Sequence, residues 1–170
     1  MFKKKEIISR GKINMNRLEL IRDLVDQIIS KINNETMKRN AYVHTYGVCY
    51  LSSIYANRLN LDEELLCIMA MLHDIAKYKD NVGHKDHALK SGIIAKELLT
   101  NTNSFTNDEI QLITNAISLH SHKYLKHDDC YTEALKDCDI LASYLYDKNI
   151  TIPQQNKHRL YYALEKINLK

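Results

Sequence analysis

The chain has 170 residues and a net charge of +3, and this length is enough for one domain with a buried core. Only four glycines and one proline are present, which argues against a turn-rich β protein and favours long helices. No run of 18 apolar residues occurs, so no membrane-spanning helix is expected.

The first 14 residues carry five basic side chains and one acidic one, and we predict that they form a flexible, solvated tail. Residues 15–170 are then predicted to form a single domain. The N-terminus lacks the apolar stretch and cleavage site of a signal peptide, which favours a cytoplasmic protein. The rest of the chain shows no basic stripe, so nucleic acid is not an expected partner, and the four cysteines are interpreted as free thiols.

Apolar side chains recur at helical spacing through most of the chain. The first predicted helix covers about residues 16–32 and is broken by Asn33 and Asn34. The second runs roughly from residue 35 or 36 to residue 59, with His44 on its inner face. The other residues assigned to that face are Val43, Gly47, Tyr50 or Leu51, and Ile54.

The third predicted helix follows Asn60 and has three acidic residues in its first turn, as the helix dipole favours. Its next residues are apolar on nearly all sides, so it should be the most buried helix. His73 and Asp74 lie near its end, and the chain then becomes polar through residues 79–84.

The fourth predicted helix opens at Asp86, which can cap it, and has His87 in its first turn. Its apolar residues at helical spacing are Leu89, Ile93, Ile94, Leu98 and Leu99. A polar loop precedes the fifth helix, which Thr106 or Asn107 can cap and which carries His120 on its apolar face.

The sixth predicted helix runs from about residue 132 to residue 146, and Asp139 interrupts its inward stripe. Pro153 suits the first turn of a last helix that continues to about residue 167. Together these patterns predict an all-α fold, a compact bundle of about six or seven helices.

Six residues place metal-binding side chains on or beside these apolar faces. They are His44, His73, Asp74, His87, His120 and Asp139. A histidine or an aspartate in a core needs a partner or a bound ion, because burying an unpaired charge is costly. Imidazoles and carboxylates suit Fe, Mn, Zn or Co better than Mg, and this set could hold one or two divalent ions. We therefore predict that the six residues converge on a metal centre.

The residues alone leave some positions open, and a single interior histidine is more often a satisfied core residue than a ligand. The rival pairs are His84 or His87, His120 or His122, and Asp137 or Asp139. His127 and His158 lie in polar surroundings and are interpreted as solvated.

The order of the six residues resembles the HD-domain superfamily of metal-dependent phosphohydrolases over roughly residues 38–147. The stretches that carry the resemblance are 44–48, 73–77, 87–92, 116–121 and 132–139. The last three look most like small stand-alone bacterial HD domains. The first two are also similar to the branch that hydrolyses diadenosine tetraphosphate symmetrically. After Asp139 the sequence departs from the pattern of both groups.

The resemblance implies an activity and a role for each residue. It implies one ion among His44, His73, Asp74 and Asp139, and a second completed by His87 and His120. Asp74 would bridge the two ions, and a metal-activated hydroxide would attack phosphorus. Lys77, one turn after His73, would stabilise the developing charge, with Lys123 as the second choice. The expected partner is a small phosphorylated substrate, a nucleotide above all, and a homodimer is compatible with the sequence.

Three alternative functions would use the same residues. The first is symmetrical hydrolysis of diadenosine tetraphosphate. The second is a di-iron oxygenase of the HD type, acting on a substrate with an activatable C–H bond. The third is a non-catalytic domain that binds a nucleotide and regulates another process, for which the altered sequence after Asp139 leaves room.

Overall fold

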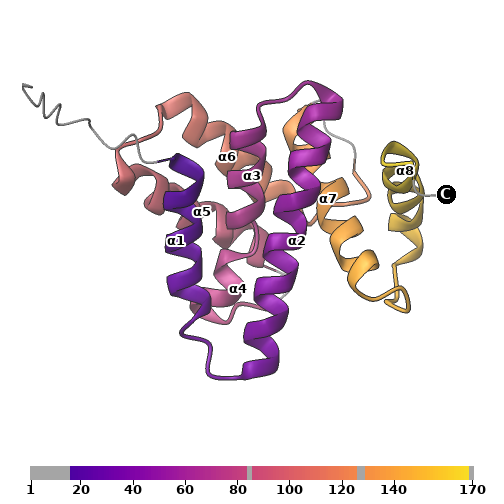
Figure 1. Cartoon of the computed structure of the whole chain (residues 1–170), viewed down its shortest axis with the longest axis horizontal. Coiled ribbons are helices and arrows are strands. Elements are labelled where there is room, and N and C mark those ends of the chain that lie inside the picture. Colours follow the sequence, from indigo (N-terminus) through magenta and orange to yellow (C-terminus); the bar gives the residue numbers. More distant parts are fainter. Residues whose placement is uncertain (1–15, 84–85, 126–128, 169–170) are drawn as a thin grey trace, which may run out of the picture.

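The computed structural model describes residues 16–83, 86–125 and 129–168, and the regular elements among them are helical (Figure 1). They are α1 (Arg17–Ile29), α2 (Glu35–Leu59), α3 (Glu63–Leu72), α4 (Ile75–Asp80), α5 (His87–Thr102), α6 (Asn107–Leu119), α7 (Cys130–Tyr146), the 3-10 helix η1 (Gln154–Asn156) and α8 (Lys157–Lys166). The predicted all-α fold is confirmed.

The predicted N-terminal tail, residues 1–14, lies outside the described residues. Within the described ranges, no helix has the length and apolar character needed to cross a membrane.

Helix α3 occupies the centre of the fold, as predicted. Its residues from Leu65 to Leu72 are all buried, and α1, α2, α5, α6 and α7 pack against it. Figure 1 shows α3 between α1 and α2, while α8 lies beside α7 at the far end of the long axis. A helix that is apolar on all sides is stable only when other elements cover it. His73 and Asp74, which directly follow α3, are therefore buried in the core.

The helix ends follow the capping rules. Asp62 begins α3 by accepting a hydrogen bond from the backbone N–H of Leu65 at 3.0 Å. Thr106, one of the two predicted caps, begins α6 as part of a capping box. Asn60, which precedes α3 in the chain, ends α2 in the left-handed conformation, with a φ of 54°.

The inner face predicted for α2 is wrong in part. Val43, Tyr50 and Ile54 are exposed, whereas Leu51 is buried. The buried residues of α2 are Ala41, Thr45, Val48, Cys49, Leu51, Ser52, Tyr55 and Ala56. Many of them are small or polar because α2 packs against α1, α3 and α7, and close helix packing needs small side chains. The apolar pattern therefore did not mark the buried side.

Helix α5 shows the same effect. Leu89 and Ile93 are 62% and 64% exposed, although they share the helical spacing of the buried Ile94 and Leu99. The side of α5 that approaches α6 contains Gly92, where an added Cβ would overlap the hydroxyl group of a serine on α6. A glycine contact holds these two helices close together, and the larger apolar residues remain outside.

The C-terminal segment differs slightly from the prediction. Pro153 precedes η1 rather than lying in the first turn of the last helix, and α8 begins at Lys157. The four cysteines are free thiols, as expected.

Candidate metal centre

The His-Asp pair lies at a break between two helices rather than inside one. Helix α3 ends one residue before His73, and α4 begins one residue after Asp74, whose φ is −109° and ψ is 13°. Adjacent residues on a regular helix diverge by about 100°. The break removes this divergence, and His73 Nε2 lies 3.5 Å from Asp74 Oδ2. The backbone N–H of Ala76 in the first turn of α4 donates to Ser91 Oγ at 3.1 Å, which anchors the break to α5.

The structure brings all six predicted ligands together at this break. His44 comes from α2 and Asp139 from α7. His87 is the first residue of α5, and His120 directly follows α6. The side chains are at most 9% exposed, except that of His44, which is 23% exposed. The cluster is therefore buried and opens to solvent beside His44.

Asp74 lies between two pairs of imidazoles. His44 Nε2 and His73 Nε2 are 3.1 Å apart, and His87 Nε2 and His120 Nε2 are also 3.1 Å apart. Asp74 Oδ2 lies 3.6 Å and 3.5 Å from the nitrogens of the first pair. Asp74 Oδ1 lies 3.3 Å and 3.5 Å from those of the second pair. One carboxylate oxygen thus faces each pair, as in a carboxylate that bridges two ions.

Asp139 lies beside both pairs. Its Oδ1 is 3.3 Å from His44 Nε2, and its Oδ2 is 4.0 Å from His120 Nε2. Two groups of three residues have potential ligand atoms within 4.8 Å of one another, namely His44, His73 and Asp139, and His73, Asp74 and His120. These nitrogen and oxygen donors suit a divalent transition metal.

Hydrogen bonds fix the protons of two of the histidines. His73 Nδ1 lies 2.7 Å from the carbonyl oxygen of Ala70, and His120 Nδ1 lies 2.6 Å from that of Ile117. A carbonyl oxygen can only accept, so each Nδ1 carries a proton. In the neutral ring Nε2 then presents its lone pair to the cluster. Metal-binding histidines in proteins are oriented in the same way.

Asp74 Oδ1 gives a second, independent indication that a cation belongs here. This oxygen is buried and accepts no hydrogen bond from the described residues. Buried polar atoms in proteins almost always have a partner. A divalent ion would satisfy both this oxygen and the nitrogen lone pairs that face it, so the residues present fit a metal.

Burial and charge set the protonation of the cluster. Burial lowers the pKa of His73 to about 3, which keeps its ring neutral at pH 7. Burial opposes ionisation of Asp74 and Asp139, but the surrounding histidines and lysines outweigh it and hold both pKa values well below the usual value. Burial also disfavours charge on His44, yet its contact with Asp139 raises its pKa overall. Ionised carboxylates and neutral imidazoles are the forms that bind metals, so a bound cation competes with a proton at His44.

Two lysines contact the carboxylates from outside. Lys77 Nζ lies 2.8 Å from Asp74 Oδ2, and Lys123 Nζ lies 2.6 Å from Asp139 Oδ2. Their side chains are partly exposed, so each ammonium stands between the cluster and solvent. Both lysines considered in the sequence therefore border the cluster.

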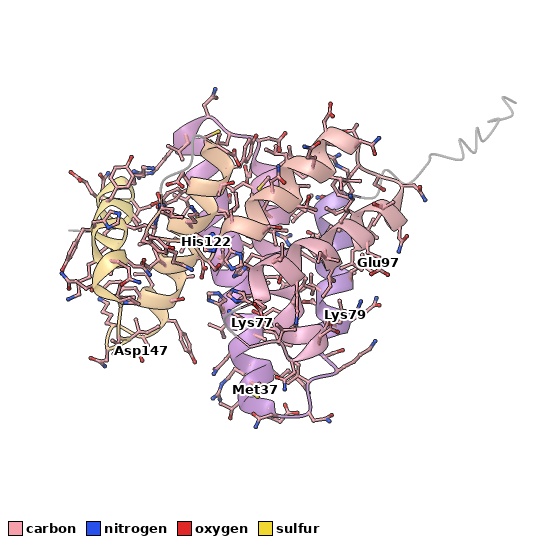
Figure 2. All side chains as sticks on the ribbon, turned by 180° about the vertical axis from the view of Figure 1, so that it is seen from behind. Met37, Lys77, Lys79, Glu97, His122 and Asp147 are labelled. Carbon is pink, nitrogen blue, oxygen red and sulfur yellow. The ribbon has the colours of Figure 1, made fainter. Side chains whose placement is uncertain are left out.

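The structure also separates most of the rival positions. His122 is exposed (Figure 2), and Asp137 points to Arg159, whose Nη1 donates to Asp137 Oδ1 at 2.7 Å. His158 is exposed, as expected. His84 and His127 lie outside the described residues.

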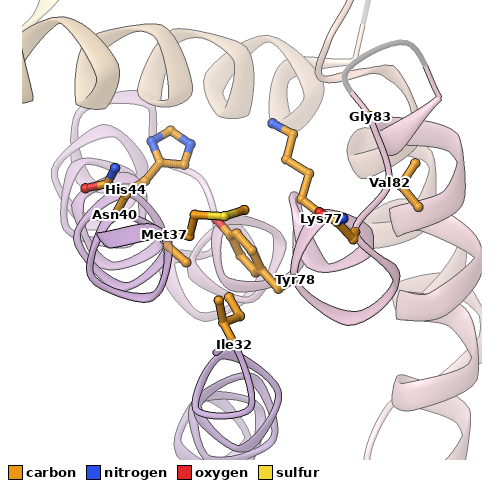
Figure 3. A pocket seen from close by; sticks show the side chains of 10 residues that line it. Ile32, Met37, Asn40, His44, Lys77, Tyr78, Val82 and Gly83 are labelled. Atoms are coloured by element: carbon orange, nitrogen blue, oxygen red, sulfur yellow. The ribbon is translucent and has the colours of Figure 1, made fainter. Parts of the chain in front are cut away.

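A pocket of about 330 Å³ adjoins the cluster between α2 and α4 (Figure 3). His44 and Lys77 form part of its wall. The other lining residues are Ile32, Met37, Asn40, Ala41, Tyr78, Asn81, Val82 and Gly83. No motif in the sequence predicts this pocket. The one available signal is that residues 37, 40, 41 and 44 have the spacing of one helix face.

A helical domain with a buried cluster of histidines and aspartates is typical of one class of metal-binding α proteins. The sequence matches the HD domain family over residues 41–154, and the chain belongs to that family, whose domains are generally metal-dependent phosphohydrolases. The predicted superfamily is thus confirmed.

The structure is also similar to the crystal structure of a predicted HD superfamily hydrolase from an uncultured Thermotogales bacterium. The TM-score is 0.59 at 20% sequence identity, over 91% of this chain and 96% of the other. At this identity the likeness supports the fold alone.

Proposed function

We propose that this protein is a metal-dependent phosphohydrolase that cleaves a phosphate ester of a nucleotide or a related small molecule. The observation that carries the proposal is the placement of Asp74 between two imidazole pairs, with one buried carboxylate oxygen lacking a hydrogen bond from the described residues. All six residues act as ligands in this proposal.

The reaction adds water to phosphorus and breaks the ester P–O bond, which gives an alcohol and a phosphate. Divalent ions at such a site lower the pKa of a bound water and offset charge on the phosphoryl oxygens. Asp74 and Asp139, as anions, hold positive charge at the cluster. Lys77 stands at the opening beside His44 and can donate to a phosphoryl oxygen, which stabilises the charge of the transition state. Lys123 contributes a second ammonium from the side of α6.

The experiment is a hydrolysis assay of untagged protein loaded with Mn, Fe, Co or Zn. The panel contains nucleotides, diadenosine tetraphosphate and nitrophenyl phosphates, and the control is a His73→Ala, Asp74→Ala double variant. We expect metal-dependent release of phosphate or a nucleotide by the wild type and not by the double variant.

Two results would contradict the proposal. One is equal activity of the wild type and the double variant under every metal. The other is saturable nucleotide binding without turnover, which would favour a regulatory domain. Oxygen uptake by the iron-loaded protein would instead favour an oxygenase, and full activity under anaerobic conditions would exclude one.

A further inference from the structure

The pocket between α2 and α4 ends at the metal centre. His44 and Lys77 line it, and the same two side chains contact Asp139 and Asp74, at 3.3 Å and 2.8 Å respectively. In Figure 3 the His44 ring and the Lys77 ammonium lie near α7, and Ile32 lies at the opposite end. A phosphoryl group held at the cluster would therefore leave the rest of its molecule in this pocket.

Among the described residues, no charged side chain lines the outer part of the pocket. Among the described lining residues, Lys77 is the one lysine or arginine, it lies at the inner end, and none is an aspartate or a glutamate. Met37, Ala41 and Val82 supply apolar surface, and Tyr78 supplies an aromatic ring whose hydroxyl already accepts a hydrogen bond from a buried threonine. Asn40 and Asn81 can bond neutral polar groups.

We propose that this pocket binds the alcohol part of a phosphate monoester, and that this alcohol is uncharged and carries one flat or branched apolar group. The proposal rests on the proposed function and narrows its substrate class. A second anionic group in the outer pocket would lose water without gaining a cation, which is unfavourable. At about 330 Å³ the pocket is near the lower end of small-molecule sites. It suits a nucleoside or an aryl group, and not two nucleosides joined by a chain of phosphates.

Met37 offers a direct test because its side chain lines the pocket and is 52% exposed, so a lysine there can keep its charge in contact with water. Met37→Lys places a cation in the outer pocket. The matched control is Ile54→Lys, which lies on the same helix at 47% exposure, adds the same charge and is outside the pocket lining.

The ligands are benzylphosphonate and 4-carboxybenzylphosphonate, which resist hydrolysis and differ by one distant carboxylate. Calorimetry on the metal-loaded protein gives both affinities, and hydrolysis of phenyl phosphate and 4-carboxyphenyl phosphate is measured alongside. We expect the wild type to prefer the uncharged ligand by roughly tenfold or more. Met37→Lys should reduce this preference by roughly three- to fivefold, whereas Ile54→Lys should leave it unchanged.

The outcomes distinguish the two proposals. Equal binding of both phosphonates by the wild type, no binding of either, or an unchanged preference in Met37→Lys would overturn the pocket assignment even if the esters are hydrolysed. The expected binding pattern without metal-dependent hydrolysis of any ester would support the pocket and overturn the proposed function.

Discussion

Asp74 and Asp139 each share one carboxylate oxygen with a lysine, and the two ammonium groups border the cluster without entering it. Lys77 is the better placed of the two to meet a substrate, because it also lines the pocket. Its ammonium contacts Asp74, and under the proposed function it also meets the phosphoryl group.

Replacement of Lys77 by methionine should lower turnover by about 10–100-fold, because a charge that stabilises the transition state is lost. Metal content should stay close to that of the wild type, since Lys77 is not a ligand. Lys79→Met is the control, as Lys79 is exposed on the same helix (Figure 2). Wild-type turnover of Lys77→Met, measured with saturating metal and substrate, would exclude this role.

His120 and His122 differ in what surrounds them. His120 is buried with Nε2 at 3.1 Å from His87 Nε2, whereas His122 is exposed. His120→Asn should weaken metal affinity by roughly tenfold or more, and His122→Asn should leave it unchanged. Competition with a fluorescent chelator measures both affinities. An equal loss in the two variants would show that the ligand has been assigned wrongly.

At the scale of residues, the sequence identified the six members of the cluster but could not choose among all of the rivals. Asp137 and Asp139 both lie on α7, whose residues from Thr132 to Ala142 are buried on nearly every side apart from Glu133. Burial therefore does not separate them, and only the resemblance selected Asp139. The structure separates them by their partners, since Asp137 faces Arg159 and Asp139 faces His44.

Among the helices, the contact of α5 with α6 controls the second imidazole pair, because His87 and His120 come from these two elements. A Cβ on Gly92 would overlap Ser118 Oγ and lie 3.1 Å from the carbonyl oxygen of Thr114. Gly92→Ala should therefore reduce the free energy of unfolding by about 1–3 kcal/mol.

The matched variant for this test is Gly47→Ala, also inside a helix, where the new Cβ would meet Ala142 Cβ at an ordinary 3.7 Å. It should stabilise the protein by up to about 1 kcal/mol, because alanine favours helix more than glycine does. Urea denaturation measures both changes. Equal effects in the two variants would contradict the close contact at Gly92.

Helix α8 is joined to the segment between α6 and α7 through Arg159. Its Nε donates to the carbonyl oxygen of Lys123 at 2.6 Å, and its Nη2 donates to that of Leu125 at 3.1 Å. The same guanidinium pairs with Asp137 at 2.7 Å and Glu133 at 2.8 Å. Arg159 thus holds the backbone of the lysine that contacts Asp139.

Arg159→Met should destabilise the protein by about 3–5 kcal/mol, because Asp137 stays buried after losing its closest partner. Lys157→Met, at an exposed position of α8, should change stability by less than about 0.5 kcal/mol. Thermal and urea unfolding give both values. A change below about 1 kcal/mol in Arg159→Met would contradict the role of this buried pair.

The sequence located the helices better than their faces or their breaks. Apolar spacing continues from α3 through Ile75 and Ala76, so it predicted one helix where the structure has two. The break is set by contacts from other elements, such as the hydrogen bond from Ala76 to Ser91, which no local pattern reveals. Val43 and Ile54 were predicted on the inner face of α2 but are exposed, because apolar spacing alone did not mark the buried side, where several residues are small or polar.

For the molecule as a whole, four helices and the break between α3 and α4 bring six side chains to a buried site that fits a divalent cation. Elemental analysis of untagged protein, purified without chelators, tests this directly when the wild type is compared with a His73→Asn, Asp74→Asn variant. We predict one or two equivalents of Fe, Mn, Zn or Co per wild-type chain and almost none in the variant, with unchanged helical circular dichroism. A metal-free wild type, or equal metal in the two proteins, would contradict the account.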